Sequence, residues 1–182
     1  LRGLAIEEQI GFNPYRFGLI GSTDSHTGMA SAEEPNFWGK FPRDGIPENK
    51  ARRWRTGEKE GGGPSGWSMS ASGLAAVWAE GNTREAILKA FRRREVYATT
   101  GPRIGARVFG GWDFTPAEAS APSIAEVGYA RGVPMGGELS AAPEGAAPTF
   151  LVHVMRDPKG ANLDRVQIVK GWIDSSGKTH EG

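Results

Sequence analysis

The sequence contains no cysteine, no long apolar run and no marked excess of either charge. Without cysteine there can be no disulfide framework, no zinc ribbon and no thiol nucleophile, so any transition metal must be held by His, Asp or Glu. The absence of cysteine does not distinguish the cytoplasm from the periplasm, because it suits both compartments.

The sequence predicts no membrane span, because no stretch is long and apolar enough, and no basic-then-apolar leader opens it. The balance of 22 Lys and Arg against 21 Asp and Glu leaves a formal charge of +1, which gives no reason to propose nucleic acid as a partner. The sequence also lacks G-x-G-x-x-G, P-loop, H-E-x-x-H and G-x-S-x-G motifs.

Glycine and proline are plentiful, at 27 and 12 of 182 residues, and the hydrophobic share is only 38%. This composition indicates much loop and several short strands. The length allows one domain, or one small domain plus part of another. Because the chain begins at Leu1 within a helical pattern and stops after a strand pattern, we expect it to be a fragment of a longer protein.

The first part of the chain predicts one helix-to-strand step of a parallel α/β architecture. Residues 1–10 carry apolar positions among charges and stop at Gly11, which is typical of a helix end with a glycine cap. The apolar run at residues 17–20 predicts a buried strand. Polar side chains that follow such a strand lie at its carboxyl end, where α/β folds place their chemistry.

A long connection separates this step from the next. Residues 29–73 keep neither a period of 2 nor one of 3.6, and our favoured interpretation is a long excursion that packs over the site. Residues 73–79 then predict a second buried strand. Residues 83–94 predict a helix, in which Asn82 precedes Glu85 in a spacing close to a capping box.

The character changes to β near Gly101. Strands are predicted at residues 104–108, 150–155 and 165–172, the last of which leads into a hairpin turn at residues 174–177. Residues 115–148 are rich in Ala, Pro and Gly and predict only brief strands. We therefore expect an α/β part over residues 1–101, followed by a small antiparallel sheet or sandwich over residues 102–182.

Asp24 and His26 follow the predicted strand at residues 17–20, two positions apart. In an extended turn this spacing lets a carboxylate and an imidazole point the same way, which suits two ligands of one metal. Gly21 before them allows close approach of the backbone. Of the other two histidines, His153 lies in an apolar strand and His180 beside a hairpin, where we expect an exposed side chain. Neither position favours a ligand.

Several segments together resemble the carboxyl-terminal part of the DUF3604 proteins, a family related to the PHP (polymerase and histidinol phosphatase) superfamily. Residues 21–26 (GSTDSH) are similar to the last metal motif of that superfamily, Gly-Ser-Asp-x-His, with Thr23 inserted. The remaining segments are SGLAAVWAE at 72–80, TREAI at 83–87, RREVYATTGPRI at 93–104, VPMGG at 133–137 and LDRVQIVKGW at 163–172.

The resemblance implies the C-terminal part of a distorted β/α barrel and a metal-dependent hydrolase, most plausibly a phosphoesterase that uses metal-activated water. It implies a cluster of two or three Zn, Mn or Fe ions in the full-length protein, with Asp24 and His26 among the ligands. The amino-terminal His-x-His segment and the middle Glu, His and His ligands are absent from this sequence, so we do not expect the fragment alone to turn over substrate. Thr100 and Arg103 are candidates for binding a phosphorylated substrate, since Arg offers a bidentate fork to phosphate.

Two other interpretations stay open. In the first, the chain is a β-sandwich binding or interaction module without catalytic activity, and the segment from Asp24 to His26 is a structural turn. In the second, it is a calcineurin-like phosphoesterase, which would also require downstream Asn-His segments that this sequence lacks.

Overall fold

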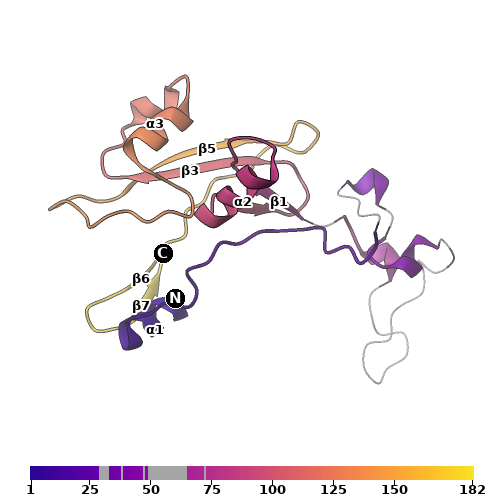
Figure 1. The fold of residues 1–182 in the computed structure, drawn as a ribbon, viewed down its shortest axis with the longest axis horizontal. Coiled ribbons are helices and arrows are strands. Elements are labelled where there is room, and N and C mark those ends of the chain that lie inside the picture. Colours follow the sequence, from indigo (N-terminus) through magenta and orange to yellow (C-terminus); the bar gives the residue numbers. More distant parts are fainter. Residues whose placement is uncertain (29–32, 38, 47, 49–64, 72) are drawn as a thin grey trace.

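A computed structural model describes residues 1–28, 33–37, 39–46, 48, 65–71 and 73–182 (Figure 1). Within these residues the helices are α1 (Arg2–Ile10), α2 (Arg84–Arg93) and α3 (Ile124–Arg131). The strands are β1 (Leu74–Val77), β2 (Val96–Thr99), β3 (Gly105–Gly111), β4 (Val133–Pro134), β5 (Thr149–Met155), β6 (Gly171–Ile173) and β7 (Thr179–Glu181). Short 3-10 helices lie at Glu34–Asn36, Pro42–Gly45, Gly66–Ser68 and Pro116–Ser120.

The strands form three small antiparallel sheets. β1 pairs with β2, β3 lies between β4 and β5, and β6 forms a hairpin with β7. The described part of the chain contains no parallel pair and no closed barrel. The structure is thus a mixture of helices and small antiparallel sheets. Strands are present where residues 73–79, 104–108 and 150–155 predicted them, although β1 is only partly buried and the sequence predicted a buried strand there.

The core lies where α3 covers the central sheet. Phe109 of β3 is fully buried and pairs in register with Leu151 of β5, so both side chains lie on one face of the sheet. Ile124 and Val127 of α3 pack against this face. Gly128 completes the fit, because a Cβ atom there would lie 2.3 Å from the Phe109 ring.

Helices α1 and α2 agree with the sequence pattern apart from one cap. α1 ends at Gly11, whose φ of 74° is the left-handed conformation expected of a glycine cap. α2 was predicted to start next to Asn82, yet its cap is Thr83, whose hydroxyl accepts a hydrogen bond from the backbone N–H of Ala86 at 3.2 Å. The error is one residue, and both side chains can cap a helix.

The predicted strand at residues 17–20 is wrong. These residues pair with no strand in the described chain, and Phe17, Leu19 and Ile20 are each more than half exposed. The segment instead runs in extended form past β2, and a Cβ atom on Gly21 would lie 3.1 Å from that of Ala98 (Figure 1). An apolar run indicates only that a segment favours an extended conformation. A strand also requires a neighbouring strand that forms hydrogen bonds with its backbone N–H and C=O groups.

The second half of the chain required two further corrections. Residues 165–170 form no strand, and only the hairpin of β6 and β7 appears where a longer strand was predicted. Residues 115–148, predicted to hold only brief strands, contain α3. Ser123 caps α3 by accepting from the backbone N–H of Glu126, so the Ser-x-x-Glu spacing was a helix signal that the Ala- and Gly-rich composition obscured.

Hydrogen bonds cross the boundary predicted near Gly101. The indole N–H of Trp78 donates to the carbonyl of Ala106 at 2.9 Å. The hydroxyl of Tyr97 donates to the carbonyl of Ile104 at 2.9 Å and accepts from the N–H of Ala106 at 3.1 Å. These bonds tie the sheet of β1 and β2 to β3, and the division into residues 1–101 and 102–182 stays a prediction.

Much of the connection at residues 29–73 lies outside the described residues, and so does most of the excursion predicted to cover the site. Its described pieces, which include three of the 3-10 helices, lie beyond the end of β1 (Figure 1). No described helix is long and apolar enough to cross a membrane.

Candidate functional site

The candidate metal motif forms a turn at the end of the extended segment. Asp24 has a φ of 49°, a left-handed conformation that Asp tolerates better than most residues. The hydroxyl of Ser22 accepts from the N–H of Asp24 at 3.2 Å, and the hydroxyl of Thr23 accepts from the N–H of Ser25 at 3.3 Å. Short polar side chains therefore hold the backbone of this turn.

The turn brings the two predicted ligands together. Oδ1 of Asp24 lies 3.3 Å from Nε2 of His26. Zinc binds carboxylate oxygen and imidazole nitrogen at about 2.0–2.2 Å, so a tetrahedral angle places two such donors about 3.4 Å apart. The observed separation therefore fits two ligands of one ion, and both side chains are about half exposed, at 62% and 51%.

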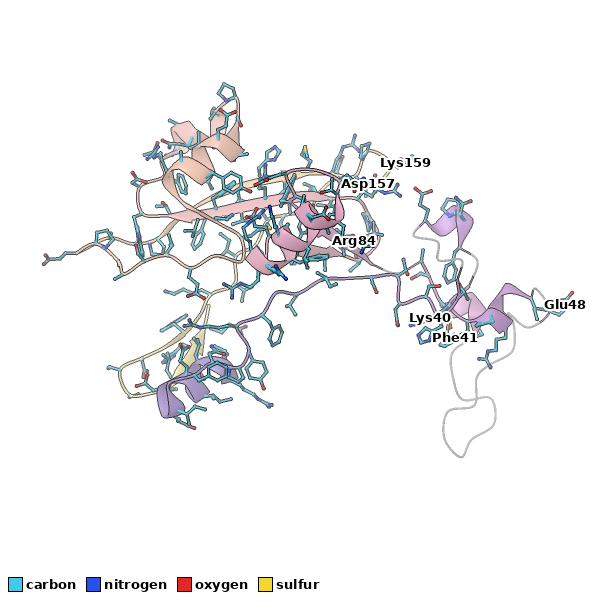
Figure 2. All side chains as sticks on the ribbon, viewed as in Figure 1. Lys40, Phe41, Glu48, Arg84, Asp157 and Lys159 are labelled. Atoms are coloured by element: carbon cyan, nitrogen blue, oxygen red, sulfur yellow. The ribbon has the colours of Figure 1, made fainter. Side chains whose placement is uncertain are left out.

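Lys40 and Phe41, which Figure 2 labels, each contact one member of this pair. The Lys40 ammonium forms an ion pair with Oδ2 of Asp24, and the Lys40 carbonyl accepts from the N–H of His26 at 2.8 Å. The ring of Phe41 lies 4.5 Å from the His26 imidazole, between ring centres. Lys40 holds the pKa of Asp24 below its usual range, and His26 adds to this effect, so Asp24 is a carboxylate at neutral pH.

Within the part of the chain that the structure describes, no third metal ligand joins the pair. No group of three or more His, Cys, Asp or Glu side chains has the geometry to hold a metal ion. His153 lies in β5, opposite Arg107 of β3. His180 is half-buried rather than exposed, because it pairs with Asp174 at 2.7 Å and stacks on Trp172.

Thr100 and Arg103 lie together in the wall of a cavity of about 340 Å³. The guanidinium of Arg103 forms an ion pair with Glu33 at 2.6 Å, and its backbone N–H donates to Oδ2 of Asp157 at 2.8 Å. Asp157 and Lys159, at the end of β5, line the same cavity (Figure 2). Backbone N–H donors from Arg103 and Lys159 lower the pKa of Asp157, which therefore stays ionised.

The cavity and the Asp24 turn both approach the end of β2. A Cβ atom on Gly73 would meet the carbonyl oxygens of Thr99 and Ser22, at 2.3 Å and 3.5 Å, so the strand end and the turn flank one glycine. The ion pair between Arg103 and Glu33 adds a second link, because Glu33 follows the turn in sequence. The start of the turn and the cavity thus both lie near the end of β2, but none of the residues that line the cavity belongs to the turn.

Sequence reasoning missed Glu33, Lys40 and Asp157. Asp157 had a detectable signal, because Asp157, Pro158 and Gly160 form a typical turn sequence after a strand. Glu33 and Lys40 lie in a stretch without periodicity, where no local pattern indicates which charged residues form ion pairs.

A family model matches this chain. The model of the family described as "Protein of unknown function (DUF3604)" matches residues 1–182, the whole chain. No curated protein and no solved structure matches. The chain therefore belongs to the DUF3604 family.

Proposed function

We propose that the full-length protein is a metal-dependent hydrolase of the phosphoesterase type, related to the PHP superfamily, and that Asp24 and His26 are two of its metal ligands. The observation that supports this most directly is the 3.3 Å separation between the donor atoms of these two side chains. The remaining ligands would come from outside the described residues, in line with a cluster of two or three Zn, Mn or Fe ions.

Asp24 and His26 are prepared for this role by their surroundings. Asp24 is already ionised, and Oδ1 is the oxygen that faces His26, while Oδ2 pairs with Lys40. The backbone bond to Lys40 and the Phe41 ring position His26 with Nε2 toward Asp24. A divalent ion held here would lower the pKa of a bound water and polarise a phosphoryl oxygen.

Thr100 and Arg103 would bind the substrate anion in the cavity that they line. A guanidinium can donate two parallel hydrogen bonds to a phosphate, and Lys159 supplies a second cation in the same wall. Glu33 forms an ion pair with the Arg103 guanidinium, so a phosphate ester would have to displace the Glu33 carboxylate. Glu33 therefore acts as an internal competitor for the substrate.

One observation favours the alternative, a binding or interaction module without catalytic activity. Lys40 already neutralises Asp24, and the bond between His26 and the Lys40 carbonyl fastens the turn to the following segment. Such a turn has a structural role even without metal. The hydrolase requires the Asp24 and His26 side chains as metal ligands, whereas the structural turn does not require a metal.

The test is the metal content of the full-length protein, compared with that of its Asp24→Ala/His26→Ala variant. The chain offers a matched control, because Asp174 and His180 form a second Asp–His pair at 2.7 Å on the hairpin of β6 and β7. We expect the first double variant to lose metal and phosphoester hydrolysis, and Asp174→Ala/His180→Ala to keep both. Equal metal content in the wild type and the first variant would refute the ligand assignment and favour the structural turn.

A further inference from the structure

A second cavity, of about 510 Å³, lies at the junction of β1, α2, β3 and α3. Its charged and aromatic lining consists of Trp78, Glu80, Arg93, Glu95, Arg107 and Tyr129. The volume is within the range of about 300–1,000 Å³ that small-molecule sites occupy. It shares no lining residue with the cavity at Thr100 and Arg103.

Arg107 is the central group of this cavity. Its guanidinium carbon lies 4.0 Å above the centre of the Trp78 ring and 5.5 Å from that of Tyr129. The indole is fixed in turn by its bond to the Ala106 carbonyl. Stacking occupies the flat face of a guanidinium and leaves its N–H edges for polar partners. One N–H of Arg107 faces the Tyr129 hydroxyl, and the edge that remains suits binding of a carboxylate.

The remaining charges in the interior of the cavity compensate one another. Glu95 is 2% exposed, and its two oxygens accept from Nε of Arg93 at 2.7 Å and from the hydroxyl of Tyr129 at 2.6 Å. Burial and the Glu95 carboxylate raise the pKa of Tyr129, so this phenol keeps the proton that it donates. No described carboxylate lies within ion-pairing distance of Arg107, whose side chain is half-buried.

We propose that this cavity binds a small monocarboxylate with a flat apolar body. The carboxylate would accept two hydrogen bonds from Arg107, and the body would pack against Tyr129 and Pro134, which line the same wall. A single negative charge is favoured over a phosphate dianion, because Glu80 is exposed at the rim and repels a second charge. The site is independent of the proposed hydrolase, since it uses neither the Asp24 turn nor the Arg103 cavity.

The test uses benzoate as the probe and the neutral isostere benzamide as its control. The full chain, labelled with ¹⁵N in Trp and Arg, is titrated while the indole signal of Trp78 and the Nε–H signal of Arg107 are followed. We expect saturable shifts of both signals with benzoate, and binding of benzamide at least about tenfold weaker, because a charge-assisted bond is lost.

Three variants complete the test. Arg107→Gln should weaken benzoate binding at least about tenfold, and Arg107→Lys, which keeps the charge but not the fork, should weaken it less. Arg92→Gln, at an exposed arginine in the last turn of α2, should bind as the wild type does. If Arg107→Gln does not fold, the comparison of benzoate with benzamide on the wild type decides. The proposal would be overturned if benzoate and benzamide bound equally well, or if a folded Arg107→Gln variant bound benzoate as tightly as the wild type does. It would also be overturned if the saturable shifts were confined to signals other than those of Trp78 and Arg107.

Discussion

Replacing Gly128 with Ala tests the packing of α3 on the central sheet. The new Cβ atom would lie 2.3 Å from two ring atoms of Phe109 and 2.6 Å from a third, far inside van der Waals contact. Phe109 is fully buried and pairs with Leu151 across the sheet, so its ring has little room to move. Either α3 must shift outward or the ring must leave its position.

The magnitude follows from two opposing effects. Overpacking a core costs about 1–3 kcal/mol, and a clash with a fully buried ring belongs at the upper end of that range. Alanine in a helix recovers about 1 kcal/mol relative to glycine. We therefore expect the free energy of unfolding to fall by about 2 kcal/mol, which lowers the melting temperature by about 4–8 °C for a chain of this size.

Thermal and urea unfolding, followed by circular dichroism, measure this loss. Gly81→Ala is the matched control, because a Cβ atom at Gly81 meets nothing within 4 Å. The control should change the free energy of unfolding by less than about 0.5 kcal/mol. A Gly128→Ala variant as stable as the wild type, or more stable, would refute the packing of α3 on Phe109.

Three further predictions concern charged groups. Glu95→Gln should lower the free energy of unfolding by about 2 kcal/mol, because a buried charge-assisted bond to Arg93 is lost; unchanged urea unfolding would contradict this. Hydrogen bonds from Thr115 and Arg131 lower the pKa of Glu118 to about 2. The ionised Glu118 therefore stabilises the folded protein fully above the pKa of the unfolded chain, and this contribution is lost as the pH falls toward 2. A carboxyl NMR titration of Glu118 with a midpoint near 4.5 would contradict this. If the full-length protein has the proposed phosphoesterase activity, Arg103→Ala should raise KM for a phosphoester at least about tenfold, and Glu33→Gln should lower it, because the competing carboxylate is neutralised. Steady-state kinetics with both KM values unchanged would exclude the cavity as the substrate site.

The sequence predicted those elements whose signals are local. α2 has a cap, an amphipathic face and basic residues in its last turn. The sequence at β3 alternates apolar residues with polar or small ones, and β5 is a short apolar run with β-branched residues. Residues 17–20 and 165–170 carry equally apolar patterns but form no strand. An extended segment becomes a strand only if its backbone pairs with another strand, which can be distant in sequence. The local pattern does not indicate whether such a strand is present.

The candidate site follows the same division. The spacing of two residues predicted the proximity of Asp24 and His26, but the backbone at Asp24 is left-handed rather than extended as the prediction assumed. The charged residues that form ion pairs with the predicted site residues could not be predicted. Lys40 reaches Asp24 from 16 residues away and Glu33 reaches Arg103 from 70, across stretches without periodicity. Long flexible charged side chains meet through tertiary folding, which leaves no trace in their immediate sequence.

The most direct test of the proposed metal ligands is an anomalous difference map of the full-length protein crystallised with zinc. We predict a peak about 2.0–2.2 Å from both Oδ1 of Asp24 and Nε2 of His26, with the Lys40 ammonium confined to Oδ2 or displaced from the carboxylate. A metal peak outside bonding distance of both side chains, with the ion pair of Asp24 and Lys40 intact, would contradict the assignment.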